Sequence, residues 1–200
     1  MGVFLLQITP YGGTFANMSH SSESSSLDVE TFLSCVYDII ADSVRNNPDK
    51  WSLENGTIKA PLDFAGYGLR RRLHQQAYEQ KKPAVLQLAG VDFRRSVNPG
   101  SKTRFLVRTK EEVLTAQPDG TVCSKQLTMG FGLGRENEPY IIVTATTHRY
   151  GKPRRVATVD LTTERRTINS PTSVELQTAL ETVRRVCSDV NRLAPPPEMD

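Results

Sequence analysis

Apolar residues recur at helical spacing near the beginning of the chain. Ser25 and Asp28 supply a capping signal, and Asn46–Asp49, which contains Pro48, ends the periodic segment. The apolar positions between these signals fall on one face of an α-helix: Phe32, Leu33, Val36, Ile39, Ile40 and Val44. This pattern predicts an amphipathic helix with one face in a core.

A second amphipathic pattern lies near the end of the chain. Thr172 and Glu175 have the spacing of a capping box, and the segment Ser173–Leu193 follows them. Its apolar residues recur at spacings of four and three: Leu176, Leu180, Val183, Cys187, Val190 and Leu193. We expect a long C-terminal helix whose apolar seam packs on a sheet.

The segment from about Asp63 to Gln80 predicts another helix, although Gly66 and Gly68 weaken its start. One side carries Leu62, Leu69, Leu73, Gln76 and Ala77, and the opposite side carries Phe64, Tyr67, Arg71, Gln75, Tyr78 and Lys82. An exposed stripe of rings and guanidinium groups suits stacking on unpaired bases. The alternative is that this side is packed as well, which the usual burial of aromatic residues favours.

The middle of the chain alternates between apolar and polar residues, as strands do. We expect strands at Ala84–Leu88, Thr103–Thr109, Val113–Gln117, Thr121–Phe131, Tyr140–Arg149 and Arg155–Leu161. Turn signals at Pro118–Gly120 and Tyr150–Pro153 join neighbouring strands as hairpins, and Asn55-Gly56 is a turn that can join two short strands. The result is an antiparallel meander of about five to six strands.

These elements predict an α+β fold with two N-terminal helices, the antiparallel meander, and the long C-terminal helix packed on the sheet. We assign residues 28–193 to a single domain, residues 1–27 to a flexible lead-in with a possible short strand at Val3–Thr9, and residues 194–200 to a proline-rich tail. The order of elements resembles the layout of helix-grip proteins, in which a curved sheet wraps a terminal helix around an apolar cavity. That layout implies a carrier of a small apolar ligand, with a cavity lined by Phe105, Val107, Met129, Phe131, Ile141 and Val143.

Charge is distributed unevenly along the 200 residues, whose formal net charge is +3. Residues 61–110 carry eleven basic and three acidic side chains, whereas residues 1–60 carry three basic and seven acidic ones. Guanidinium groups bind phosphates with two parallel hydrogen bonds and stack on flat rings. We therefore expect a polyanion as partner, RNA first among them. The alternative is that these arginines are solvated or paired with carboxylates.

The main hypothesis is a non-enzymatic binding or assembly protein, such as a ribonucleoprotein component or a viral structural protein. The candidate phosphate-binding residues are Arg70, Arg71, Arg72, Arg94, Arg95, Arg104 and Arg108, and Tyr67 and Tyr78 are candidates for stacking. Two alternatives stay open: the apolar carrier, and a protein–protein interaction module that binds a protein partner or forms a homo-oligomer.

We find no catalytic motif, so the sequence favours a non-enzymatic role without excluding an enzyme. His148, Cys123 and Asp160 would form a triad only if strand register brought them together, and a strand-end histidine is the simpler interpretation. The glycines of Gly130–Arg135 do not form a dinucleotide loop, because Arg135 replaces the last glycine and a strand-like segment follows.

We predict no metal and no cofactor, because the histidines and cysteines lack the spacing of metal ligands. Three cysteines without a CxxC pair indicate a reducing compartment. No apolar run approaches the roughly 20 residues of a spanning helix, so we expect no transmembrane segment. The expected location is intracellular, either cytoplasmic or nuclear.

Overall fold

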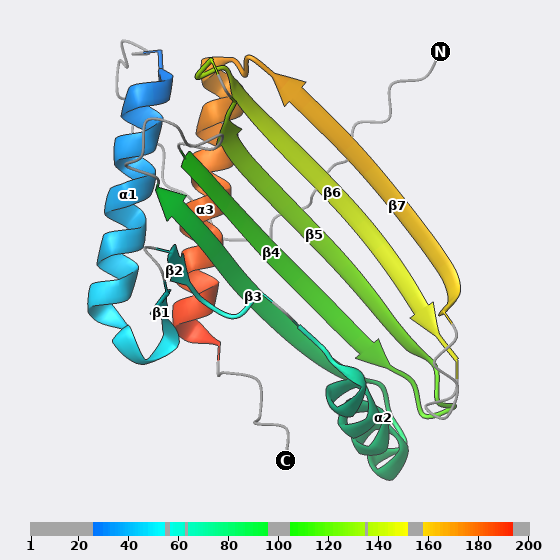
Figure 1. The fold of residues 1–200 in the computed structure, drawn as a ribbon. Helices are drawn as coiled ribbons and strands as arrows, with labels where there is room; N and C mark the ends of the chain where they lie inside the picture. Colours follow the sequence, from blue (N-terminus) through cyan, green and yellow to red (C-terminus); the bar gives the residue numbers. More distant parts are fainter. Residues whose placement is uncertain are drawn as a thin grey trace, which may run out of the picture.

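The chain forms a seven-stranded antiparallel sheet with three α-helices, seen in a computed structural model (Figure 1). The structure describes residues 26–54, 57–62, 64–95, 105–134, 136–151 and 158–193, with the backbone alone at residues 54 and 158–161. The strands lie in chain order: β1 (Ser52–Glu54), β2 (Thr57–Lys59), β3 (Ala84–Arg95), β4 (Phe105–Ala116), β5 (Val122–Leu133), β6 (Pro139–Tyr150) and β7 (Thr158–Asn169). The predicted α+β class is confirmed. The possible strand at Val3–Thr9, the tail at 194–200 and most of the lead-in lie outside the described residues.

The helices are α1 (Val29–Asn46), α2 (Tyr67–Gln80) and α3 (Ser173–Arg192), and a 3₁₀ turn, η1 (Pro48–Lys50), follows α1. The predicted capping box of Thr172 and Glu175 is confirmed, whereas α1 is capped by Asp28 itself and Ser25 lies outside the described residues. The Asp28 carboxylate accepts the Thr31 backbone N–H at 2.8 Å, and Thr172 and Glu175 form a reciprocal capping box.

The helix α2 begins later than the predicted Asp63. Gly66 is its N-cap, and Ala65 just before it has a φ of 41°, in the left-handed region. A right-handed helix cannot continue through that conformation, so the first helical residue is Tyr67. Gly66 therefore stands at the delayed start of the helix, whereas Gly68 lies inside it.

The predicted strand boundaries are wrong for β3, β4 and β7, and β7 ends at Asn169 instead of the predicted Leu161. Thr103–Thr109 and Val113–Gln117 were expected as separate strands, but β4 continues through the charged residues Lys110, Glu111 and Glu112. Glu111 and Glu112 both pair in register with β3, and their side chains point to opposite faces of the sheet. Similarly, β3 extends seven residues beyond Leu88, through Gly90 and the buried Asp92.

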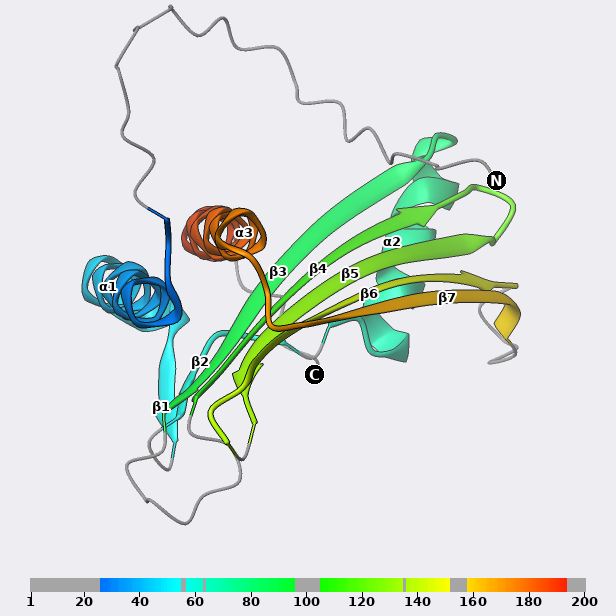
Figure 2. The ribbon, with the colours of Figure 1, turned by 90° about the horizontal axis from the view of Figure 1, so that it is seen from above.

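The sheet has two faces, and different helices cover them (Figure 2). Phe93, Val107 and Phe131 pack with α1 and α3, on what we call the α1/α3 face. The alternate residues of β3 and their register partners form the α2 face, where Leu88 and Leu114 pack with α2. The helix α2 contacts β3 and β4 around these residues, at one end of the strands. The rest of the α2 face is therefore not covered by this helix.

The core on the α1/α3 face contains the residues expected to line an apolar cavity. Phe105, Val107, Met129, Phe131 and Ile141 are buried there, and Val143 packs against them. The ring centroids of Phe32 in α1 and Phe131 in β5 lie 4.3 Å apart. These side chains therefore fill the space between the sheet and the two helices.

Candidate anion-binding site

A row of charged side chains crosses three strands on the α2 face. Asp92 in β3 pairs in register with Lys59 in β2 and with Arg108 in β4. Arg94 lies two residues along β3 and so shares the same face. Side chains directly opposite one another on neighbouring strands have Cβ atoms only about 5 Å apart. One carboxylate is therefore surrounded by basic residues from its own strand and from both neighbours.

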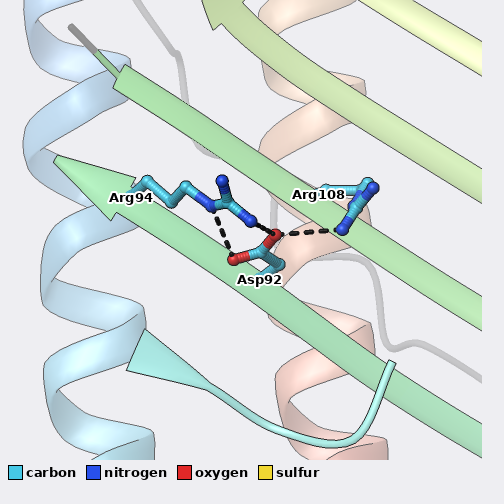
Figure 3. Close-up of polar contacts among 3 residues, drawn as sticks. All are labelled: Asp92, Arg94 and Arg108. Atoms are coloured by element: carbon cyan, nitrogen blue, oxygen red, sulfur yellow. Dashed lines mark hydrogen bonds and ion pairs between the residues drawn. The ribbon is translucent and has the colours of Figure 1, made fainter. Parts of the chain in front are cut away.

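Asp92 binds both arginines (Figure 3). Its Oδ2 accepts hydrogen bonds from Nη2 of Arg94 at 3.1 Å and from Nη2 of Arg108 at 3.0 Å. Its Oδ1 accepts a third from Nε of Arg94 at 3.3 Å. Asp92 is 1% exposed, while the side chains of Arg94 and Arg108 are 54% and 48% exposed. The buried carboxylate thus orients two guanidinium groups that stay accessible to solvent.

These residues line a pocket of about 640 Å³. The lining comes from η1 and β1, from β2 and the segment after it, and from β3 and β4: Asp49, Lys50, Trp51, Ser52, Lys59, Ala60, Pro61, Leu62, Asp92, Arg94 and Arg108. Lys50 is engaged in the fold, since its Nζ donates to the backbone carbonyls of Asn191 and Leu193 at the end of α3.

The segment Ala60–Leu62 lies directly against the sheet at Gly90. A Cβ on residue 90 would come within 1.9 Å of the Pro61 carbonyl oxygen, so a side chain there would collide with backbone. The Ala60 N–H also donates to the Val91 carbonyl at 3.0 Å. This segment forms one wall of the pocket.

Basic and hydroxyl side chains continue across the α2 face beyond the pocket. Lys110 in β4 and Arg165 in β7 belong to this face by register, as do the threonines Thr128, Thr144, Thr146, Thr163 and Thr167. Among the strand side chains of this face that the structure describes, the acidic ones are Asp92 and Glu112, and both are buried. The solvent-accessible charge that the described side chains of these strands present on this face is therefore positive.

The structure brings together only some of the predicted arginines. Arg94 and Arg108 share Asp92, but Arg95 lies on the α1/α3 face, with its guanidinium 5.7 Å from the ring centroid of Tyr37. The guanidinium of Arg70 lies 4.4 Å from the ring centroid of Tyr150 and donates to the Ala65 carbonyl at 2.9 Å. Arg70 is thus part of the packing that holds α2 to the sheet.

The remaining candidates lie on α2 or outside the described residues. Arg71 and Arg72 are exposed on α2, while Arg104 falls in the part that the structure does not describe. Leu88, under α2, and Arg94 lie six positions apart in β3, a span of roughly 20 Å at the rise of an extended strand. The two groups of arginines therefore lie at different ends of the same side of the sheet.

The aromatic and basic side of α2 is exposed, and the packed alternative is wrong for most of it. Tyr67 and Tyr78 are 45% and 56% exposed, and Lys81 lies with its Nζ 3.9 Å from the Tyr78 ring centroid. Phe64 is the exception, because it is half-buried against the apolar cluster under α2. The helix α2 packs against the sheet on one side, so its other side stays in solvent.

Sequence reasoning missed Lys59, Asp92 and Gly90. The i, i+2 spacing of Asp92 and Arg94 within a strand is a usable signal, because it places both side chains on one face. Lys59 carries no such signal, since its position beside Asp92 depends on the pairing of β2 with β3.

The hypothetical triad cannot form. Cys123 pairs with Arg149, whereas His148 pairs with Ser124, so Cys123 and His148 lie on opposite faces. Burial raises the pKa of the Cys187 thiol to about 12, which makes that cysteine a poor nucleophile. Within the described ranges, no three histidine, cysteine or acidic side chains are grouped as metal ligands. The pocket presents two guanidinium groups held by one carboxylate, a chemistry that suits an anion.

Comparisons with protein-family models, with curated proteins and with solved structures give no match to this chain. None of the helices in the described part of the chain is long and apolar enough to cross a membrane.

Proposed function

We propose that this protein is a non-enzymatic RNA-binding protein that holds single-stranded RNA on the α2 face, with phosphates bound by Arg94 and Arg108. One observation carries the proposal: Asp92, almost completely buried, orients two arginines whose side chains are about half exposed, on a face where the accessible charges of the described strand side chains are basic. Phosphate contacts dominate the affinity of such complexes, and fixed donors bind with a smaller loss of conformational entropy.

The rest of the α2 face supports contacts with the same ligand. Lys110 and Arg165 extend the positive charge across β4 to β7, and the threonine hydroxyls can donate to phosphate and sugar oxygens. At the other end of the sheet, Tyr67 and Tyr78 present exposed rings on which unpaired bases can stack. Flat rings on the same side of the sheet as the guanidinium groups suit single strands, whose bases are free to stack.

The rival interpretation is that Asp92, Arg94 and Arg108 only stabilise the pairing of β3 with β4. A purely structural ion cluster does not require the side chains of both arginines to be about half exposed. It also gives no reason for a wall of backbone at Gly90 that leaves a pocket next to the cluster. Both features follow if an anion is bound there.

The proposal is tested by measuring the affinity for a labelled single-stranded RNA at increasing salt concentration, by fluorescence anisotropy. For single strands, the slope of log Kobs against log salt steepens by about 0.7 for each phosphate contacted. The wild type should give a steep slope, and the double variant Arg94→Gln/Arg108→Gln should reduce it by about 1.4, the share of two contacts. Absence of binding, or a slope unaffected by the double variant, would overturn the proposal.

A further inference from the structure

We propose that the pocket beside Arg94 and Arg108 binds a phosphate monoester, the phosphorylated end of the RNA. This inference rests on the proposed function and specifies which part of the ligand enters the pocket. It depends on the walls of the pocket, on its volume, and on the donors that the two guanidinium groups present.

The pocket is closed toward the end of β3 that α2 covers. The Ala60–Leu62 segment lies on Gly90 with backbone against backbone, between Asp92 and the end of β3 that α2 covers. A second wall, at the β1 edge of the sheet, comes from η1, Trp51 and β1, and Trp51 donates from Nε1 to Oδ1 of Asn191 at 3.2 Å. An RNA strand that crosses the sheet from β5 toward Arg94 therefore meets the wall at the β1 edge and cannot continue straight across, as it would in a groove.

The side toward β5 is open. Gly130 pairs in register with Arg108 and shares its face. A Cβ on Gly130 would meet no heavy atom closer than 3.9 Å, so the surface beside Arg108 is unobstructed. A chain lying across β5 and β6 can thus end at Arg108 with its terminal group in the pocket.

The volume and the donors suit a terminal nucleotide with its phosphate. A pocket of about 640 Å³ falls within the ~300–1,000 Å³ range of sites that enclose small ligands. A phosphate monoester has three terminal oxygens and a charge of about −1.5 to −2 at neutral pH. An internal phosphodiester has two such oxygens and one charge. Guanidinium groups from two strands, oriented by one carboxylate, therefore favour the monoester.

The test compares three RNAs of one sequence, carrying a 5′-phosphate, a 3′-phosphate or hydroxyl groups at both ends. One phosphorylated RNA should bind about tenfold tighter than the hydroxyl RNA, the factor that a charge-assisted hydrogen bond provides. The RNA that gains affinity identifies the end that enters. Arg108→Gln should remove this preference and Arg108→Lys should reduce it, because lysine keeps the charge but lacks the planar fork. Arg95→Gln, on the opposite face, should leave it unchanged.

The outcomes separate this inference from the proposed function. Equal affinity for all three RNAs, with binding retained, overturns the monoester pocket and leaves RNA binding in place. Failure of every RNA to bind overturns the proposed function. A nucleoside monophosphate that then still binds, and loses affinity in Arg108→Gln, supports the monoester pocket with a free nucleotide as its source. Thermal unfolding of each variant verifies that it is folded.

Discussion

Arg94 and Arg95 are consecutive in β3, yet their side chains lie on opposite faces of the sheet. Arg94 donates two hydrogen bonds to the buried Asp92, while Arg95 lies near the ring of Tyr37 from α1. In a strand, two adjacent basic residues cannot serve one surface, because successive side chains alternate. Substituting Arg94 or Arg95 therefore removes the same charge from the α2 face or from the α1/α3 face.

Replacing Asp92 should destabilise the fold. Asp92→Asn removes the charge and one of the acceptors that hold Arg94 and Arg108, and it places amide N–H groups against guanidinium donors. We expect the free energy of unfolding, measured with urea, to fall by about 1–3 kcal/mol. Asp42→Asn is the control, since Asp42 is exposed and pairs only with its helical neighbour Arg45 among the described contacts. A loss as large in Asp42→Asn would contradict this role of Asp92.

Gly90 and Gly130 should respond differently to the same substitution. Gly90→Ala forces a methyl group into the Pro61 backbone and should lower the free energy of unfolding by about 1–3 kcal/mol. Gly130→Ala has open space and should leave stability unchanged or slightly higher. Urea unfolding of both variants measures the difference, and a tolerated Gly90→Ala would show that the Ala60–Leu62 segment does not rest on the sheet.

The capping box of α3 should make stability depend on pH in the acidic range. The backbone N–H and then the hydroxyl of Thr172 hold the pKa of Glu175 below its ordinary value of 4.5. The contribution of this carboxylate is therefore present above that value and is lost as the pH falls through the pKa in the folded state. Glu175→Gln should be less stable than the wild type at neutral pH and equal to it once Glu175 is protonated.

Thermal unfolding of both proteins across this pH range measures the effect. Glu181→Gln, at an exposed position later in α3 where the carboxylate accepts from Gln177, is the matched control. A stability difference between Glu175→Gln and the wild type that persists unchanged in acid would contradict the capping role.

Phe131 should be among the most costly residues to truncate. It is fully buried, and its ring contacts Phe32 from α1 and Phe105 from β4. Phe131→Ala should lower the free energy of unfolding by about 3–5 kcal/mol, because it removes apolar contacts and leaves a cavity. Val85→Ala, at an exposed position of β3, should change it by less than about 0.5 kcal/mol. Similar losses in both variants, measured with urea, would contradict the placement of the core.

Much of the fold follows from local signals in the sequence. The caps at Asp28 and Thr172, the periodicity of the helices they begin, and the turn at Pro118–Gly120 each depend on residues close together in the chain. The lengths of β3 and β4 could not be predicted in this way. The apolar pattern is interrupted by Gly90, Asp92 and Glu112. Each is accommodated by a contact that exists only in the folded chain: the Ala60–Leu62 segment lies on Gly90, Arg108 binds Asp92, and the Ser124 hydroxyl donates to Glu112.

The site was predictable only in part. The excess of arginine in residues 61–110 identified Arg94 and Arg108, but composition does not distinguish Arg94 from Arg95. The decisive arrangement joins Lys59, Asp92 and Arg108 from three strands, and it exists only through the register of β2, β3 and β4. A single sequence carries no local signal for such pairings.

The most direct test of the account compares Arg94→Gln with Arg95→Gln in one RNA titration at fixed salt. Both variants remove one positive charge from the same strand, so their effects on net charge are identical. The account predicts that Arg94→Gln weakens binding about tenfold or more, while Arg95→Gln changes it by no more than about twofold. Equal losses in the two variants would contradict it, because they would mean that binding depends on total charge and not on the α2 face.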